Sequence, residues 1–388
     1  MDIQNKFIAS GCNTTYKAVS WHKKQPLVAY ASSHNVNIYD PEGNRVFASL
    51  TGHTARVNIP KFFLQQKEIT LISGAADGTL IIWKNSGDVF NPKDWRQDFS
   101  IKLDESVSNI SIYEVSDSLA YVLTLTTSTQ VGLWEYNGKE LKQLDKLLFG
   151  TTYQEAGQLE LIDKKYLLIL LGGIDNLIHI YTFDIENKES KFNYHLSLKG
   201  HENAITDFAV AHVQQGEEKY CLIASSSRDT LIRLWKLSDY DKEKDQMKAF
   251  QNKNNHKIIL PNNKMLILSL ESILSGHSDQ ISSVSWGLAD STKNDFSESN
   301  LLLLSTGFDF SCWVWQNDKK DDLWINRYRL GQIGGNKNAF FGAVYNGDFT
   351  RILAYTYTGA FYLWKIEKNE YRLHPTITGH FGAVTDLD

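Results

Sequence analysis

The chain has 388 residues, of which 42% are hydrophobic, and a formal net charge of −5 at pH 7. This nearly balanced charge argues against a general phosphate-binding surface of the kind that holds nucleic acid. The three cysteines (Cys12, Cys221 and Cys312) are far apart and form no CxxC pair, which argues against a zinc site and fits a reducing compartment.

The N-terminal sequence MDIQNKFIASGCN has no basic start followed by an apolar run, and the apolar stretches fall well short of the ~18 residues of a membrane span. We therefore expect a soluble protein of the cytoplasm, with the nucleus as a second location and no membrane partner. The eleven histidines show neither HxxxH nor HExxH spacing, so we expect no metal and no other cofactor.

Short apolar segments that end in an aromatic residue recur along the chain. Their last residues are, in chain order, Tyr39, Trp83, Trp134, Tyr181, Trp235, Trp315 and Trp364. By subtraction, five of the six intervals are 44 to 54 residues, close to the period of about 40–45 of a WD repeat, which forms one four-stranded propeller blade. The remaining interval of 80 residues contains two polar stretches, 238–257 and 287–300, that we interpret as loops. The pattern predicts an all-β fold, a seven-bladed WD-repeat β-propeller over residues 1–379.

The strands of each blade are predicted from β-branched and aromatic runs between turn residues. We expect strands at 17–22, 26–32, 35–40 and 45–52 in the first blade, and at 204–213, 220–227, 231–237 and 264–276 in the fifth. The run YLLILLGG (166–173) lacks alternation, as expected for a strand covered on both faces. No window shows sustained helical periodicity, so we expect almost no helix.

Three blades share a set of four residues that we call a tetrad. In each, a Gly-His pair precedes a serine, an aspartate follows the serine by four residues, and a tryptophan follows the aspartate by six. The tetrads are His53, Ser73, Asp77 and Trp83 in the second blade, His201, Ser225, Asp229 and Trp235 in the fifth, and His277, Ser305, Asp309 and Trp315 in the sixth.

Serine, histidine and aspartate are also the residues of a hydrolase triad, which is the alternative function for each tetrad. An enzyme needs one triad with an exposed nucleophile, whereas the chain has three copies and SGAAD shows no GxSxG turn. In an antiparallel blade the Gly-His pair and the aspartate lie on the same rim. The imidazole can then join the carboxylate to the serine hydroxyl, which accepts the indole N–H, so that every buried polar atom has a partner. We therefore predict structural tetrads, no catalytic residue and no enzymatic activity.

Loop lengths distinguish two rims of the predicted propeller. The long inserts at one rim are 84–98, 184–191, 213–218, 238–262 and 287–300. The opposite, tight-turn rim carries the Gly-His pairs, and exposed arginine and aromatic side chains there are typical of protein interfaces. The candidate partner contacts on it are Arg56, Arg228, Asn336, Phe340 and Phe341, with Arg56 favoured over the two phenylalanines.

Two of these interpretations have alternatives. Phe340 and Phe341 could instead begin the inner strand of the last blade and belong to the core. The lysines that follow Lys242 could bind RNA, but the acidic residues among them favour a solvated loop.

Several stretches resemble the first propeller of the Elongator subunit-two family, in order along essentially the whole chain. They include LTGHTARVN (50–58), LSGHSDQISSVSW (274–286), LWINRYRLGQIGGNKNAFFGAVYN (323–346) and GHFGAVTDLD (379–388). The third stretch is the specific one, because Gly-His and a terminal tryptophan mark only the WD-repeat superfamily. The chain departs from the family at GHENAITDF and GHSDQISSV, where family members often carry a tryptophan shortly after Gly-His.

The resemblance implies a non-catalytic scaffold subunit of Elongator, which carries out carboxymethyl-type modification of the tRNA wobble uridine (U34). The implied protein partners are the catalytic subunit, which uses radical-SAM chemistry and acetyl-CoA, and the largest subunit, with tRNA contacted at most indirectly. The resemblance also implies that residues 380–388 are the first strand of a following repeat, at the start of a second propeller. The alternative function is that of a WD-repeat adaptor in another assembly, such as a ubiquitin ligase or a chromatin complex.

Overall fold

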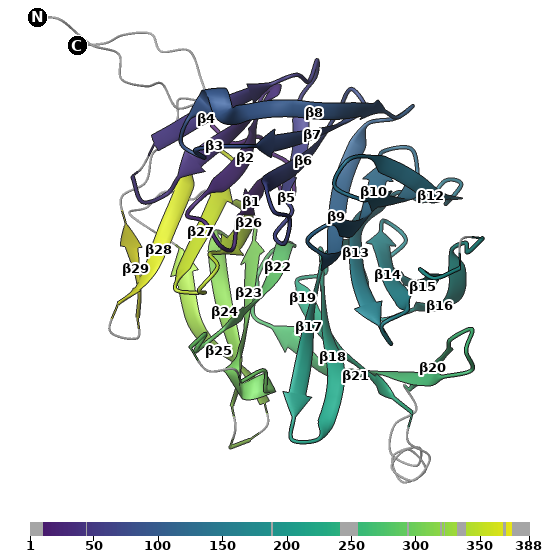
Figure 1. The fold of residues 1–388 in the computed structure, drawn as a ribbon. Helices are drawn as coiled ribbons and strands as arrows, with labels where there is room; N and C mark the ends of the chain where they lie inside the picture. The colour runs from purple at the N-terminus through teal and green to yellow at the C-terminus, as the bar shows by residue number, and fades with distance from the viewer. Residues whose placement is uncertain are drawn as a thin grey trace, which may run out of the picture. The chain divides into compact units, whose positions relative to one another are not determined.

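The computed structural model describes residues 11–374, apart from 44, 188, 241–254, 293–294, 319, 322, 332–338 and 368–369. Within this described part, the strands form seven antiparallel sheets, and the helical segments are two single 3-10 turns, η1 (Pro92–Asp94) and η2 (Glu298–Asn300). The predicted fold class, an all-β seven-bladed WD-repeat β-propeller, is confirmed, and each sheet is one blade (Figure 1).

The chain divides into two compact units, and the first comprises Met1–Thr151 and Leu330–Asp388. It holds blades one, two, three and seven, each with its strands paired in chain order. These strands are β1 (Val19–Trp21), β2 (Val28–Ser32), β3 (Asn35–Asp40), β4 (Arg45–Thr51); β5 (Val57–Phe62), β6 (Ile69–Ala75), β7 (Thr79–Asn85), β8 (Trp95–Lys102); β9 (Val107–Ser116), β10 (Leu119–Thr126), β11 (Gln130–Tyr136), β12 (Leu141–Leu148); and β26 (Phe340–Tyr345), β27 (Arg351–Thr356), β28 (Phe361–Glu367), β29 (Glu370–His374).

The second unit comprises Thr152–Arg329 and holds blades four, five and six. Its strands are β13 (Gln154–Ile162), β14 (Tyr166–Gly173), β15 (Ile178–Asp184), β16 (Asn193–Leu198); β17 (Ile205–Gln215), β18 (Glu218–Ser227), β19 (Leu231–Asp239), β20 (His256–Ile259), β21 (Met265–Ser275); and β22 (Ile281–Leu288), β23 (Leu301–Gly307), β24 (Ser311–Asp318), β25 (Leu323–Gly331).

The position of a strand in its blade is reflected in its sequence. All eight residues of β14, YLLILLGG, are buried, because strands β13 and β15 flank it and side chains of blade five pack against it. The outer strand β25, LWINRYRLG, alternates between exposed and half-buried residues along most of its length. Inner strands therefore read as continuous apolar runs, and outer strands as alternating ones.

Two of the predicted loops were wrong. Residues 256–259, inside the predicted loop 238–262, form β20, which pairs with β21 and makes blade five a five-stranded sheet. The predicted insert at 213–218 is an extension of the hairpin, since β17 and β18 stay paired as far as Gln215 and Glu218. The proposed start of a second array at 380–388 lies outside the described residues.

In the first unit, blade seven packs directly against blade one, and Figure 1 shows β1 beside β26. The hydroxyl of Tyr355 accepts a hydrogen bond from the backbone N–H of Ala18 at 3.1 Å, across 337 positions of sequence. The ring of Phe361 lies 5.1 Å from that of Tyr30 and 5.8 Å from that of Tyr39. The first and last blades of the chain are thus neighbours.

In the second unit, the apolar cores lie between adjacent sheets rather than within one sheet. One core joins side chains of blade four, such as Leu168, to side chains of blade five, such as Ile223. A second joins blade five to blade six. Polar links accompany the second, because the buried Asp207 carboxylate accepts the backbone N–H of Val284 at 3.1 Å. Each blade is therefore held by its neighbours.

Candidate functional site

The tetrad of blade six forms an unbroken chain of hydrogen bonds. Oδ2 of Asp309 lies 3.0 Å from Nδ1 of His277, and Nε2 of that imidazole lies 2.8 Å from Oγ of Ser305. The indole N–H of Trp315 donates to the same Oγ atom at 2.9 Å. Asp309 also accepts the backbone N–H of Ser278, and thereby ties the start of the blade to its b–c turn.

Blade five has the same arrangement. Oδ2 of Asp229 lies 2.8 Å from Nδ1 of His201, and Oγ of Ser225 lies 2.9 Å from Nε2. Trp235 donates its indole N–H to Ser225 at 3.1 Å. The four residues come from the turn before β17, from β18, from the b–c turn and from β19, so the tetrad links four segments of one blade.

Blade two differs at one link. Nε2 of His53 lies 2.7 Å from Ser73, which accepts the indole N–H of Trp83 at 2.8 Å, as in the other tetrads. Nδ1 of His53, however, lies 2.6 Å from Oγ1 of Thr79, and Thr79 donates to Asp77 at 2.5 Å. The direct distance from Nδ1 to Oδ1 of Asp77 is 3.8 Å, too long for a hydrogen bond. A threonine relay therefore replaces the direct link expected from the sequence.

The glycine of the Gly-His pair allows close packing above the tetrad. A Cβ atom on Gly276 would lie 2.4 Å from the indole ring of Trp313, closer than any carbon contact allows. The ring of Trp313 in turn lies 5.3 Å from the ring of His277. Glycine at this position therefore lets an aromatic side chain of β24 cover the histidine.

Protonation states follow from burial and hydrogen bonding. Burial lowers the pKa of His53 to about 4, so its imidazole is neutral at pH 7. Burial alone would raise the pKa of Asp77, but hydrogen bonds from Thr79 and Thr54 outweigh it and hold the pKa well below its usual range. For Asp309 the hydrogen bond with His277 likewise outweighs burial and lowers the pKa. Each carboxylate is therefore an ionised acceptor.

The three serines are enclosed. Ser73, Ser225 and Ser305 are each 0% exposed, and each hydroxyl oxygen already contacts both an imidazole and an indole nitrogen. A hydrolase needs its nucleophile within reach of a substrate carbonyl. The geometry suits hydrogen-bonded struts and leaves no exposed nucleophile at these three positions.

Two further blades keep part of the same hydrogen-bond chain. In blade three the indole N–H of Trp134 donates to Oγ1 of Thr124 at 2.9 Å. In blade four Nε2 of His179 lies 2.6 Å from Asp175, and Nδ1 lies 2.7 Å from Ser197. Sequence reasoning missed His179 because it looked for the histidine in a Gly-His pair ahead of the blade. The available signal was the spacing of four residues across the tight β14–β15 turn.

Arg56, a candidate partner contact, lies exposed in the tight segment between Gly-His and β5. Its Nε donates to Oδ1 of Asn58 at 3.3 Å. The amide of Asn58 in turn donates to the backbone carbonyl of Val107 at 2.7 Å, across the joint between blades two and three. The guanidinium therefore lies at the surface, above the edge of this joint.

Arg228 is less free than its place in the b–c turn suggested. Its Nη2 lies 2.5 Å from Oε1 of Glu155, whose side chain is 9% exposed. Burial raises the pKa of Glu155, and the charge of Arg228 offsets part of that increase. Arg228 thus links blade five to blade four. Its guanidinium is already engaged by a carboxylate of this protein.

The two phenylalanines belong to the core, so their prediction as partner contacts was wrong. Phe340 and Phe341 open β26 and are 3% and 9% exposed. The ring of Phe340 packs 6.0 Å from that of Trp364, and the ring of Phe341 lies 5.5 Å from that of Tyr16. The alternative, that they begin the inner strand of the last blade, is the correct one. Asn336 lies outside the described residues.

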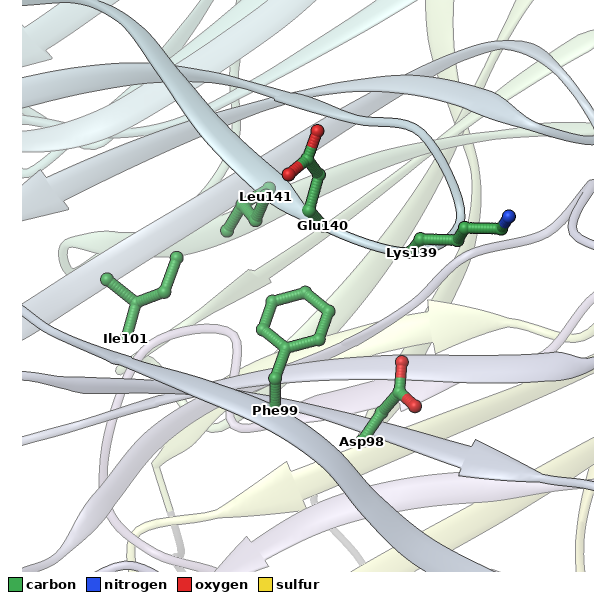
Figure 2. A pocket seen from close by; sticks show the side chains of 6 residues that line it. All are labelled: Asp98, Phe99, Ile101, Lys139, Glu140 and Leu141. Carbon is green, nitrogen blue, oxygen red and sulfur yellow. The ribbon is translucent and has the colours of Figure 1, made fainter.

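A surface pocket lies between the outer strand of blade two and the β11–β12 turn of blade three (Figure 2). Its lining residues are Asp98, Phe99, Ile101, Lys139, Glu140 and Leu141. The carboxylate of Asp98 is engaged by the ammonium group of Lys84 at 2.7 Å. The lining thus combines an apolar floor with charges of both signs and offers no nucleophile or metal-binding cluster.

Two features are absent from the described residues. Over the ranges that the structure covers, no group of three or more His, Cys, Asp or Glu side chains is placed to hold a metal ion. Among those same residues, no helix is long and apolar enough to cross a membrane.

A family model described as "WD domain, G-beta repeat" matches residues 192–236. The matched segment runs from the outer strand of blade four to the third strand of blade five, and contains all four residues of the fifth-blade tetrad. The WD-repeat identity of this blade thus rests on the family model as well as on its hydrogen-bond geometry.

Nearly the whole chain is similar to proteins named Elongator complex protein 2. The identity is 27% to the protein of Dictyostelium discoideum, over 98% of this chain and 48% of the relative. It is 29% to the protein of Danio rerio, over 97% and 45%, and 29% to that of Homo sapiens, over 93% and 44%. The chain spans about half the length of the curated relatives it matches. The resemblance to the Elongator subunit-two family is confirmed.

Proposed function

We propose that this homologue of Elongator complex protein 2 is a non-catalytic scaffold subunit that bridges the catalytic and largest subunits of Elongator, and so supports modification of the tRNA wobble uridine. The observation that carries the proposal is the similarity over nearly the whole chain to relatives of that name. The proposal includes a cytoplasmic location, with the nucleus as a second one, and contact with tRNA at most through the partner subunits.

The tetrads support a role without catalysis. Their serines are enclosed and their hydrogen bonds are mutually satisfied, so these three Ser–His–Asp sets are used inside the blades. A net charge of −5 also gives no general attraction for RNA.

We place the docking face on the tight-turn rim around Arg56. Its guanidinium is exposed and makes a single long hydrogen bond, so a partner carboxylate could engage it without disturbing the fold. Charged groups at an interface contribute mainly through complementarity, and a reversed charge at a contact can cost several kcal/mol. Arg228 is a poorer probe of this face, because it is paired with Glu155.

The test is co-purification of the tagged chain with co-expressed Elongator subunits. We expect the parent chain to recover the catalytic and largest subunits and to have no activity of its own on tRNA. Arg56→Glu should weaken recovery about tenfold or more, with an unchanged melting temperature, because an exposed charge contributes little to folding. Lys146→Glu on the outer strand β12, where Lys146 is exposed, is the matched charge-reversal control.

The outcomes separate the two parts of the proposal. Full recovery with Arg56→Glu would place the docking face elsewhere while keeping the Elongator assignment. Recovery of ubiquitin-ligase or chromatin proteins instead of Elongator subunits would overturn the assignment itself.

A further inference from the structure

A second chain of hydrogen bonds, away from the tetrads, contains a cysteine. In blade five His212 of β17 is paired directly across the ladder with Cys221 of β18, so both side chains leave the same face of the sheet. Sγ of Cys221 lies 3.4 Å from Nδ1 of His212. Nε2 of the same imidazole lies 2.8 Å from Oε1 of Glu160, on β13 of blade four. Thiol, imidazole and carboxylate thus stand in the order of an activated cysteine.

The electrostatics of His212 differ from those of the tetrad histidines. The hydrogen bond with Cys221, followed by that with Glu160, raises the pKa of His212 to about 10. An imidazole protonated at neutral pH donates from both nitrogens, so the sulfur must be the acceptor of the Nδ1–H group. The Cys221 sulfur therefore accepts its hydrogen bond from a cationic imidazole, the kind of partner found beside reactive cysteines.

The chain contains its own comparison, because its other two cysteines lack such partners. Cys12 and Cys312 are 3% and 0% exposed, and burial raises the pKa of each well above its ordinary value. Cys221 is 8% exposed, but the His212 side chain next to it is 59% exposed, which leaves the approach along the imidazole open to a small molecule. Of the three, only Cys221 has both an imidazole partner and an exposed neighbouring side chain.

We propose that Cys221 is a reactive thiol that small hydroperoxides oxidise to a sulfenic acid, with His212 and Glu160 as its positioning residues. The sulfur attacks one oxygen of hydrogen peroxide, so that an S–O bond forms and the O–O bond breaks. The sulfur loses two electrons to the peroxide. The leaving hydroxide takes the proton that His212 holds and departs as water, so that thiol plus peroxide gives sulfenic acid plus water.

Other functions of this cluster fit less well. The histidine stands between the sulfur and the carboxylate, so no single point is near all three, and among the described residues no metal-binding group is found. A peptide substrate could not reach the side chain of a residue that is only 8% exposed. Peroxide is small enough to pass beside the imidazole.

Oxidation would act on the joint between blades four and five. The Glu160–His212 contact crosses this joint, and the sulfur is the second acceptor that holds the imidazole. After the oxidation His212 has given up its Nδ1 proton and no longer donates to the sulfur. The histidine would then be held by Glu160 alone, and the joint would loosen without the loss of its apolar core.

The experiment is peroxide treatment of the native chain with dimedone present to trap sulfenic acid, followed by digestion and mass spectrometry. We expect the adduct on Cys221 at a level about tenfold or more above that on Cys12 and Cys312. Iodoacetamide labelling of the urea-unfolded chain checks that all three cysteine peptides are detected. Equal adduct on the three cysteines, or less on Cys221, overturns the proposal without any variant.

Substitution of the positioning residues supplies the second test. His212→Gln should slow adduct formation at pH 7 about tenfold or more, because the cationic donor is lost, and its rate should climb steeply with pH. Glu160→Gln should cause a smaller loss. The parent should show a flatter pH profile, a difference that a merely structural role would not produce. An unchanged rate and pH profile in a folded His212→Gln variant, as judged by its melting temperature, overturns the proposal.

Discussion

The hydroxyl of Thr79 lies 2.6 Å from Nδ1 of His53 and occupies the place that an aspartate takes in the other two tetrads. The carboxylate of Asp77 comes next in the hydrogen-bond chain, after Thr79. It accepts the hydroxyl of Thr79 and the backbone N–H of Thr54. The second-blade tetrad is therefore a five-membered chain. Its histidine depends on a residue that the tetrad spacing does not include.

Thr79→Val should lower the free energy of unfolding by about 1–3 kcal/mol, since it leaves Nδ1 of the buried His53 without a partner. The matched variant in blade six is Ser311→Ala, which removes a hydroxyl that likewise lies two positions after its aspartate and donates to it, at 2.7 Å. Its effect should be smaller, because His277 keeps its direct contact with Asp309. Urea unfolding curves of both variants give the comparison, and equal losses would contradict the relay.

Asp77→Ala should also lower the free energy of unfolding by about 1–3 kcal/mol. The reason is not the loss of a direct contact with His53. The variant removes the acceptor of the backbone N–H groups of Thr54 and Thr79 and of both threonine hydroxyls. Thermal melting measures the loss. Asp117→Ala, which removes an exposed carboxylate on the turn after β9, should change the melting temperature little.

Ser225→Ala should lower the free energy of unfolding more than Thr124→Val does. The first strands two buried donors or acceptors, Nε2 of His201 and the indole N–H of Trp235, whereas the second strands only the indole N–H of Trp134. Each lost partner is expected to cost about 1–3 kcal/mol. Chemical denaturation ranks the two variants. A hydrolytic activity abolished by Ser73→Ala, but not by Ser225→Ala or Ser305→Ala, would contradict the structural role of the tetrads.

Acid should destabilise the fold through His53. Its folded pKa of about 4 lies below the ordinary value of 6.5, so between these two pH values the unfolded chain binds a proton that the folded chain does not. The free energy of unfolding therefore rises with pH across this window and falls on acidification. From pH 7 to pH 5 the share of His53 is about 2 kcal/mol.

The measurement is the urea midpoint of parent and variant at the two pH values. His53→Gln should be less stable at pH 7, and its further loss at pH 5 should be smaller than that of the parent by the His53 share. His34→Gln removes an exposed histidine and should keep the pH dependence of the parent. A pH dependence of His53→Gln identical to that of the parent would contradict the assignment.

Asp207→Ala should be among the more damaging single substitutions, because it breaks a link between blades. The side chain is 3% exposed and accepts the backbone N–H of Val284 from blade six and that of Phe208 from its own strand. Both N–H groups would be left buried without an acceptor, and each should lower the free energy of unfolding by about 1–3 kcal/mol. Hydrogen exchange at Val284 reports the loss directly, and protection as high as in the parent would contradict the link.

The blade count and most of the strands could be predicted because each blade repeats the same local pattern. The first-blade strands at 28–32, 35–40 and 45–51 lie within or match their predicted ranges, since turn residues bound them in the sequence. Strand β20 could not be predicted, because HKII is short and gains its partner only when β21 folds alongside.

The site was less predictable than the fold, because its contacts depend on partners that come together only in the folded chain. Spacing predicts which residues share a rim, but it does not determine which of two nearby oxygen atoms reaches an imidazole, as Thr79 shows. The burial of Phe341 depends on the distant Tyr16, and the pairing of Arg228 depends on Glu155, 73 positions away. Contacts between blades leave no periodic signal in a single sequence.

The hydrogen bond between Ala18 and Tyr355 has a consequence for how the chain is made. During synthesis blade one leaves the ribosome more than 300 residues before the strand that supplies Tyr355. Until then the rings of Tyr30 and Tyr39 have no Phe361 to cover them, and the loop that must close is long. Blade one therefore keeps an apolar face open to water while more than 300 further residues are made. That face is the natural target for a chaperone acting on the nascent chain.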